Sequence, residues 1–350
     1  MAGEYTEEEG DDAPPPPCCS KCSFLLHVVR EVCGLLCCPP VPSRIAGKLA
    51  FVPPLPSYDV RKAPDEGSDK PRYQLWLQPS DYHNTPGGEL RLQAPTAERE
   101  GFTQDVEWLR TSNGDFIPAV FLHNADPEAA FTLLFSHGNG TDLGQMYSFL
   151  AMLATQLRVN IFFYEYSGYG ASTASMPGEA AVIRDAEAAW SCLVEKHKVP
   201  PSRVILYGQS VGSGPSCSLA ARENYQPAGL VLHSPIMSGM RVIMQVQRTF
   251  SIDPFPNIDL VPHVRCPVAV IHGKKDEVVP FEHGRKMYGA LKKPFNYKPL
   301  WIENGGHNNI VGFASYYGYV RGFLASLLEA ERAAGAQRAA AGAESTAAGP

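Results

Sequence analysis

The feature that most constrains the fold is an alternation of short apolar runs with longer amphipathic stretches, between residues 106 and 332. The apolar runs lie at 131–135, 159–164, 204–206, 230–232, 268–271 and 299–302. Helices are predicted between them, at 143–157, 178–198, 213–222 and 281–291, with a last one at 313–332. Nearly all-apolar strands alternating with helices predict an α/β protein whose central sheet is mostly parallel, with helices on both faces.

A hairpin precedes this alternating series. Two strand-like segments, 106–109 and 117–122, are joined by Ser-Asn-Gly-Asp, and the Asn-Gly pair favours a tight turn. We therefore expect an antiparallel pair of strands at the start of the sheet.

The composition predicts four regions. Residues 1–52 combine an acidic, proline-rich leader, expected to be disordered, with a cysteine-rich segment. Residues 53–98 are rich in Pro, Asp and Gly and predict an irregular lead-in, while residues 99–332 form the α/β domain. Residues 333–350 are rich in Ala and Gly and predict a frayed or disordered tail.

The charge distribution argues against one class of partner. The net charge is −6, and the first thirteen residues contain six acidic residues and no Lys or Arg. The rest of the chain is therefore neutral overall and carries no basic field for a phosphate backbone, so nucleic-acid binding is not expected.

A serine on a glycine-rich turn is the first candidate catalytic group. Ser210 stands in Gly-Gln-Ser-Val-Gly, directly after the strand at 204–206 and before the helix at 213–222. A strand-to-helix turn of this kind presents a nucleophile at the edge of a sheet, although the motif also occurs as an ordinary glycine-rich turn.

A serine nucleophile needs a base and an orienting acid, and both follow in the chain. Asp276 comes just after the strand at 268–271, and His307 just after the strand at 299–302. The order Ser, acid, His is that of α/β-hydrolases, so these three residues are the predicted triad. The competing acids are Glu277, Asp253 and Asp259, and the competing bases are His233, His263, His272 and His283.

Backbone N–H groups are needed to stabilise the oxyanion of an acyl intermediate. We predict that Val211, next after the nucleophile, supplies one donor and that Asn139, in the loop Ser-His-Gly-Asn-Gly, supplies the other, with Gly140 as the neighbouring option. The alternative for this loop is a turn that only caps the following helix. No metal ligand and no cofactor are predicted for the site.

Several segments together carry a family resemblance. "FSHGNGTDLGQM", "YEYSGYGAS", "YGQSVGSGP", "LHSPIMSGMRV", "HGKKDEVV" and "GGHNN" resemble the α/β-hydrolase domain-containing protein 17 family, over about residues 100–325. The resemblance implies an α/β-hydrolase fold with a small cap, which we expect after Arg241. It also implies a membrane-associated serine hydrolase that removes palmitate from S-acylated proteins, with Ser210, Asp276 and His307 as its triad. The chain departs from the family pattern in having Glu165 where Asp is usual and Asn309 where an acidic residue is usual.

The cysteine-rich segment admits three interpretations. Cysteines beside a short apolar stretch, with Arg44 and Lys48 beyond it, favour S-palmitoylation. A Cys-x-x-Cys spacing allows a zinc site instead. The third alternative is that the thiols are unmodified. The resemblance favours acylation of six residues: Cys18, Cys19, Cys22, Cys33, Cys37 and Cys38.

The expected location follows from this segment. The N-terminus is acidic where a signal peptide would be basic, so we expect the reducing, cytosolic face of membranes, with a palmitoyltransferase acting on the tail. The resemblance implies plasma and endosomal membranes and S-palmitoylated substrates such as Ras-type GTPases or scaffolds. A carboxylesterase or monoacylglycerol lipase, and a catalytically inactive scaffold bound to the membrane, stay open as alternatives.

Overall fold

The computed structural model describes residues 51–63, 72–77, 92–93, 102–126, 129–174, 176–244, 246 and 248–347, the last ten of these and 92–93 by their backbone alone. The six N-terminal cysteines and the acidic leader lie outside the described residues. Among the residues described, there is no helix that combines the length and the hydrophobicity needed to cross a bilayer.

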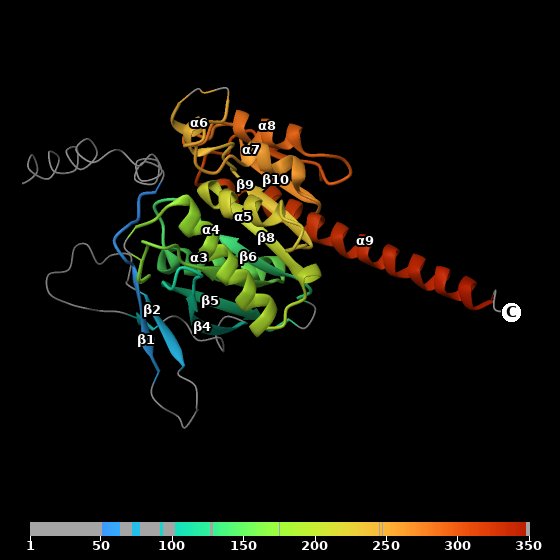
Figure 1. Ribbon diagram of the computed structural model, residues 1–350, viewed down its shortest axis with the longest axis horizontal. Coiled ribbons are helices and arrows are strands. Elements are labelled where there is room, and N and C mark those ends of the chain that lie inside the picture. Colours follow the sequence, from blue (N-terminus) through green and yellow to red (C-terminus); the bar gives the residue numbers. More distant parts are fainter. Residues whose placement is uncertain are drawn as a thin grey trace, which may run out of the picture.

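An eight-stranded sheet forms the centre of the molecule, in the order β11-β10-β9-β8-β6-β7-β5-β4 (Figure 1). β4 and β5 form the predicted antiparallel hairpin, β5 is antiparallel to β7, and the pairs from β7 to β11 are parallel. The strands are β4 (Phe102–Arg110), β5 (Phe116–Asn124), β6 (Thr132–Ser136), β7 (Asn160–Tyr164), β8 (Val204–Gln209), β9 (Gly229–His233), β10 (Val268–Gly273) and β11 (Leu300–Ile302). The predicted mostly parallel sheet is confirmed.

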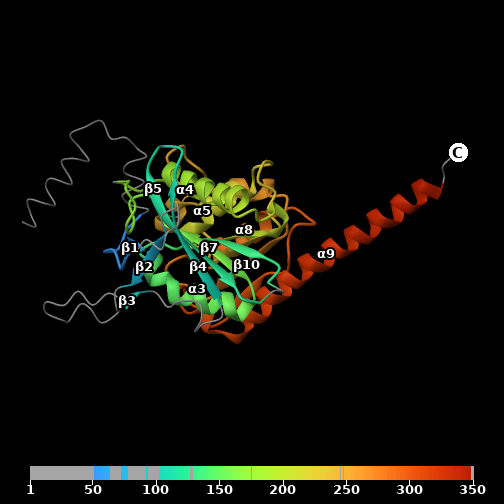
Figure 2. The ribbon, with the colours of Figure 1, turned by 90° about the horizontal axis from the view of Figure 1, so that it is seen from below.

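Helices cover both faces of the sheet, as predicted (Figure 2). One face packs against α4 (Glu179–Ser191), α5 (Ser213–Ala220) and α8 (Glu282–Ala290), and the other packs against α3 (Leu143–Leu157) and α9 (Ala314–Ala347). The shorter helices are α6 (Gly239–Ile243), α7 (Asn257–Leu260), the π-helix η3 (Cys192–Lys196), and the 3₁₀ turns η4 (Pro201–Arg203), η5 (Ser210–Gly212), η6 (Val261–His263) and η7 (Ile310–Gly312).

The pleat of the strands explains why the sheet has a hydrophobic core on each face. Successive side chains of a strand point to opposite faces of the sheet. In β6, Leu134 joins the core under α4 and α5, while Leu133 and Phe135 join the core under α3 and α9. A strand with apolar residues at every position is therefore buried on both sides.

The structure differs from the prediction in the lead-in. The segment predicted to be irregular contains a small antiparallel sheet of β1 (Tyr58–Lys62), β2 (Tyr73–Leu77) and β3 (Leu92–Gln93). Tyr58 and Leu75 are fully buried in the core beside α3. This sheet is held by packing against the main domain, a contribution that local composition does not reveal.

The C-terminal stretch also differs from the prediction. A frayed or disordered tail was expected from Ala333, but α9 continues as one helix to Ala347 and projects from the domain (Figures 1 and 2). The physical reason is helix propensity, since eight of the fifteen residues 333–347 are Ala, the residue that most favours the helix even without tertiary contacts.

Candidate active site

Ser210 lies on a very tight turn between β8 and α5. Its backbone has φ = 53°, a left-handed conformation that is unfavourable for residues with a side chain and typical of strained functional turns. A Cβ atom on Gly208 would lie 2.6 Å from the Gly212 carbonyl oxygen, and one on Gly212 would lie 2.1 Å from the Ser136 carbonyl oxygen. Both flanking glycines are therefore required by close backbone contacts.

The structure brings the three predicted residues together in one hydrogen-bonded chain. His307 Nε2 lies 3.1 Å from Ser210 Oγ, and His307 Nδ1 lies 2.8 Å from Asp276 Oδ2. Ser210 and His307 are both more than nine-tenths buried. The arrangement places a base against the serine hydroxyl and a carboxylate against the far side of the base.

The surroundings of Asp276 keep it ionised. Burial alone would raise the pKa of the Asp276 carboxyl, but hydrogen bonds from His272 and His307 outweigh burial and hold this pKa well below its ordinary value. The backbone N–H groups of Val278 and Val279 also donate to Asp276 Oδ1, at 3.0 and 2.7 Å. The carboxylate is thus fixed in position and negatively charged, as an orienting acid must be.

The competing acids have other contacts. Glu277 is exposed, and its Oε2 accepts the backbone N–H of His307 at 3.2 Å, so it supports the loop that carries His307. Asp253 is buried against Arg241 at 3.2 Å, and Asp259 accepts the hydroxyl of Thr249.

The competing histidines are held away from the serine or have structural contacts. Tyr207 bonds to Nδ1 of His233 at 2.9 Å, and burial, with the charge of His307, lowers the pKa of His233 to about 3. His283 accepts the N–H of Met237, and burial lowers its pKa to about 4. His263 is exposed. His272 bonds to the Val279 carbonyl oxygen at 2.8 Å, and its ring also lies 3.3 Å from Asp276.

The predicted oxyanion loop lies beside the serine. A Cβ atom on Gly138 would lie 3.7 Å from Ser210 Cβ, so the backbone of this loop is in near contact with the turn at Ser210. The Asn139 side chain fastens the loop, because its Oδ1 accepts from the Val52 N–H at 2.8 Å and from the Tyr169 hydroxyl at 2.7 Å. Val211 is buried within η5.

A buried network supports the same loop and was not identified as functional from the sequence. Glu165 is completely buried, and its two oxygens contact His137 Nε2 at 3.1 Å and the Tyr58 hydroxyl at 2.8 Å. Tyr166 stacks on His137 and donates to the His137 carbonyl oxygen at 2.7 Å. The signal available in the sequence was the glutamate in an otherwise apolar and aromatic run, since a buried charge requires several donors.

The other departure from the family pattern also has a structural use. Asn309 Oδ1 accepts the Gly306 N–H at 2.8 Å, closing a turn around His307. An amide oxygen can accept this bond as a carboxylate would.

The expected cap is small. It consists of α6 and the loop that leads to α7, at the end of the sheet where β9 stops. Its start is anchored to the core by Met237, which is buried, whereas Ile243 and Met244 are exposed. Groups able to hold a metal ion occur, within the described part of the chain, at β4 and β5 and not at Ser210.

Comparisons with known proteins show the family to which this chain belongs. A family model described as serine aminopeptidase, S33 matches residues 127–260. α/β-Hydrolase domain-containing protein 17C of Xenopus laevis is 43% identical over 300 residues, covering 84% of this chain and 93% of the relative. The chain belongs to the α/β-hydrolase domain-containing protein 17 family. The human 17B member of this family is 41% identical over 299 residues, covering 85% of this chain and 96% of the relative.

Solved structures extend the likeness to the fold. An esterase from Pyrococcus furiosus superposes with a TM-score of 0.55 at 17% identity, covering 67% of this chain and 94% of that one. The α/β-hydrolase fold is therefore confirmed. Membership of the family and this fold together support a serine hydrolase.

Proposed function

We propose that this family member removes palmitate from S-acylated cysteines of membrane-associated proteins, using Ser210, His307 and Asp276 as its catalytic triad. The observation that carries the proposal is the hydrogen-bonded chain from Ser210 Oγ through His307 to Asp276. The same chain of contacts argues against an inactive scaffold, since each of the three groups has the partner that catalysis requires.

The reaction proceeds through an acyl-enzyme. Ser210 Oγ attacks the carbonyl carbon of the palmitoyl thioester while His307 Nε2 accepts the hydroxyl proton. The Asp276 carboxylate holds the imidazole in the correct tautomer and stabilises the imidazolium. The backbone N–H groups of Val211 and Asn139 stabilise the oxyanion. The carbon–sulfur bond breaks, the cysteine leaves with the proton from His307, and palmitate stays esterified to Ser210.

Water completes the cycle. His307 accepts a proton from a water molecule as the water oxygen attacks the ester carbonyl of palmitoyl-Ser210. The Ser210 oxygen then leaves with that proton, palmitic acid is released, and the enzyme returns to its starting state.

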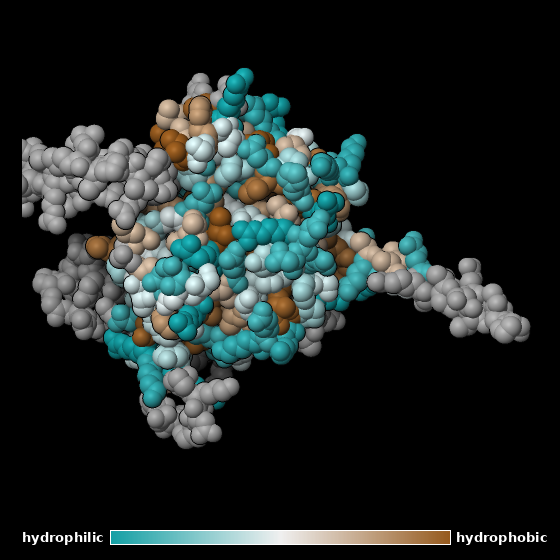
Figure 3. Space-filling model, viewed as in Figure 1, coloured by the Kyte–Doolittle hydropathy of each residue, from teal (hydrophilic) through white to brown (hydrophobic). Residues whose placement is uncertain are grey.

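An exposed apolar surface supports a substrate in a bilayer. In Figure 3, hydrophobic residues gather at the top of the molecule, around α6. Six large apolar side chains, each at least 45% exposed, come from the cap loop and from the segment that directly follows the cysteine-rich region: Ile243, Met244, Phe250, Ile252, Val52 and Leu55. The two segments meet where Phe51 packs edge-on against Phe255, with ring centroids 5.8 Å apart. Apolar patches of this kind mark lipid or protein contact sites.

The function is tested by comparing a palmitoyl-thioester peptide with its oxygen-ester analogue, for wild type and for Ser210→Ala. After subtraction of spontaneous hydrolysis, we expect faster Ser210-dependent release of palmitate from the thioester. Ser210-dependent activity mainly on the oxygen ester would assign the enzyme to carboxylester or monoacylglycerol hydrolysis instead. The absence of Ser210-dependent activity on both substrates would contradict a hydrolase.

The location is tested at the N-terminal cysteines, for which we propose acylation. Replacing Cys18, Cys19, Cys22, Cys33, Cys37 and Cys38 with Ser should move the protein from the membrane fraction to the soluble fraction, because stable anchoring needs more than one acyl chain. Hydrolysis of a short, water-soluble ester should be unchanged. The matched control is Cys192→Ser in the folded domain, which should stay on membranes. Unchanged fractionation of the six-site variant would refute the acyl anchor.

A further inference from the structure

A second cluster of ionisable side chains lies at the β4 edge of the sheet, separated from β8 by three strands. Asp105 comes from β4, His123 comes from β5, and His197 follows η3. One potential ligand atom from each lies within 4.8 Å of the other two. We propose that these three side chains form a binding site for a divalent transition metal, and that Zn²⁺ is the ion that suits their one-oxygen, two-nitrogen donor set.

The separation of two of the ligand atoms is close to that in a zinc site, and all three atoms lie within 4.8 Å of one another. His123 Nε2 lies 2.9 Å from Asp105 Oδ2, whereas neighbouring ligand atoms on tetrahedral zinc are about 3.3 Å apart. The buried Phe121 ring contacts both imidazoles, with centroids 3.8 Å from His123 and 4.8 Å from His197, and so limits the positions of both rings.

The π-helix η3 places His197 at the site. The His197 N–H donates to the Cys192 carbonyl oxygen at 3.1 Å, which is the five-residue hydrogen bond of a π turn. The side chains of Cys192 and His197 consequently reach the same carboxylate. Glu107 accepts from Cys192 Sγ at 3.0 Å and contacts His197 Nε2 at 2.9 Å.

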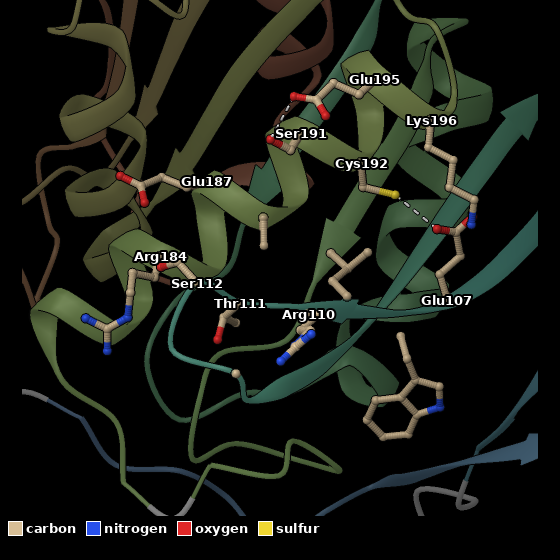
Figure 4. A pocket seen from close by; sticks show the side chains of 14 residues that line it. Glu107, Arg110, Thr111, Ser112, Arg184, Glu187, Ser191, Cys192, Glu195 and Lys196 are labelled. Atoms are coloured by element: carbon tan, nitrogen blue, oxygen red, sulfur yellow. Dashed lines mark hydrogen bonds and ion pairs between the residues drawn. The ribbon is translucent and has the colours of Figure 1, made fainter.

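Glu107 acts as a positioning residue for His197. A carboxylate bonded to a metal-binding imidazole is the usual partner that sets ring orientation and ligand strength. Cys192 Sγ and the Lys196 ammonium also contact Glu107, at 3.0 and 2.8 Å, so this carboxylate is held in place beside His197. Figure 4 shows Glu107 between Cys192 and Lys196, on the wall of a cavity of about 680 Å³.

A neighbouring group of three residues also has ligand atoms within 4.8 Å of one another, namely Glu107, Cys192 and His197. This group suits a cation less well. The Lys196 ammonium lies 2.8 Å from Glu107 and would repel a metal bound there. Burial, together with the Glu107 carboxylate, raises the pKa of the Cys192 thiol well above its ordinary value, which opposes the thiolate that metals require. In contrast, the Asp105 side chain is 56% exposed, so an ion can reach it from solvent.

Zinc binding is tested with the full chain, in a background where the six N-terminal cysteines are Ser, which removes the competing Cys-x-x-Cys ligands. After treatment with a chelator and dialysis, calorimetric titration with ZnCl₂ should show one Zn²⁺ bound per chain. His123→Ala and His197→Ala should each weaken binding at least about tenfold, and Glu107→Gln by about 10- to 100-fold. The matched control is His263→Ala, which replaces an exposed histidine elsewhere and should bind as the parent does.

Two readouts separate a metal site from a merely structural cluster. Zinc at about 100 times its Kd should raise the Tm by about 5 °C in the parent and not in His123→Ala. Hydrolysis of a soluble ester by the variants, measured without metal, should match the parent and show that they are folded. No zinc uptake, or uptake that survives His123→Ala and His197→Ala, would overturn the site.

The ligand set is tested with Co²⁺ as a spectroscopic substitute. We expect visible d–d absorption without a sulfur-to-cobalt charge-transfer band, and no change in this spectrum on Cys192→Ser. A sulfur band that disappears in Cys192→Ser would place the metal on Glu107, Cys192 and His197 and would contradict the proposed ligands.

Discussion

Replacing Ser210 with Ala should lower kcat/KM for ester and thioester substrates by at least about 10⁴-fold. Ala keeps the turn but removes the hydroxyl oxygen that lies 3.1 Å from His307 Nε2. The loss of one hydrogen bond should lower the Tm by no more than about 3 °C. Initial rates with a soluble ester, together with a thermal melt, measure both effects.

A second serine provides the control for this variant. Ser216 is buried in α5, and its hydroxyl donates to Ser136 Oγ, at 3.3 Å. Ser216→Ala makes the same chemical change six residues later in the chain and should retain activity within a few-fold. Equal activity losses in Ser210→Ala and Ser216→Ala would indicate a folding defect, and full activity in Ser210→Ala would refute the nucleophile.

Replacing Asp276 with Asn should lower kcat by about 10⁴-fold, with little change in KM. The Asp276 carboxylate accepts from His307 Nδ1 at 2.8 Å, which keeps Nε2 free to take the Ser210 proton. An amide can offer its NH₂ group to Nδ1 and so favour the wrong tautomer, and it cannot stabilise the imidazolium. Steady-state kinetics on a soluble ester measure the loss.

The adjacent acid is the control for Asp276. Glu277→Gln makes the same change one residue later, at an exposed side chain whose oxygen accepts the His307 backbone N–H. A glutamine oxygen can still accept this bond, so activity should fall by less than about tenfold. A larger loss of activity in Glu277→Gln than in Asp276→Asn would mean that Glu277, and not Asp276, is the acid that orients His307.

Much of the main sheet could be predicted because its strands are buried on both faces. A run such as 131–135, or 268–271, has few alternatives to a central strand. The close approach of Ser210, Asp276 and His307 could also be predicted, since the carboxyl ends of parallel strands meet at one edge of a sheet. The structure brings together the three residues that the chain order indicated.

What could not be predicted depends on contacts between distant parts of the chain. β1 exists because Tyr58 is buried beside α3 and donates to Glu165, 107 residues later. The support of the Asn139 loop by Glu165, His137 and Tyr166 is likewise long-range. The π turn at Cys192 inserts one extra residue into a helical pattern, and no propensity distinguishes it from the end of an α-helix.

The central claim, that Ser210 is a nucleophile activated by His307, is tested most directly by covalent labelling. Wild-type protein would be treated with a fluorophosphonate, digested and mapped by mass spectrometry, with Ser210→Ala and Ser216→Ala in parallel. The account predicts one adduct on the peptide containing Ser210, lost in Ser210→Ala, retained in Ser216→Ala, and formed far more slowly in His307→Ala. An adduct on another residue, or the absence of labelling in folded wild-type protein, would contradict it.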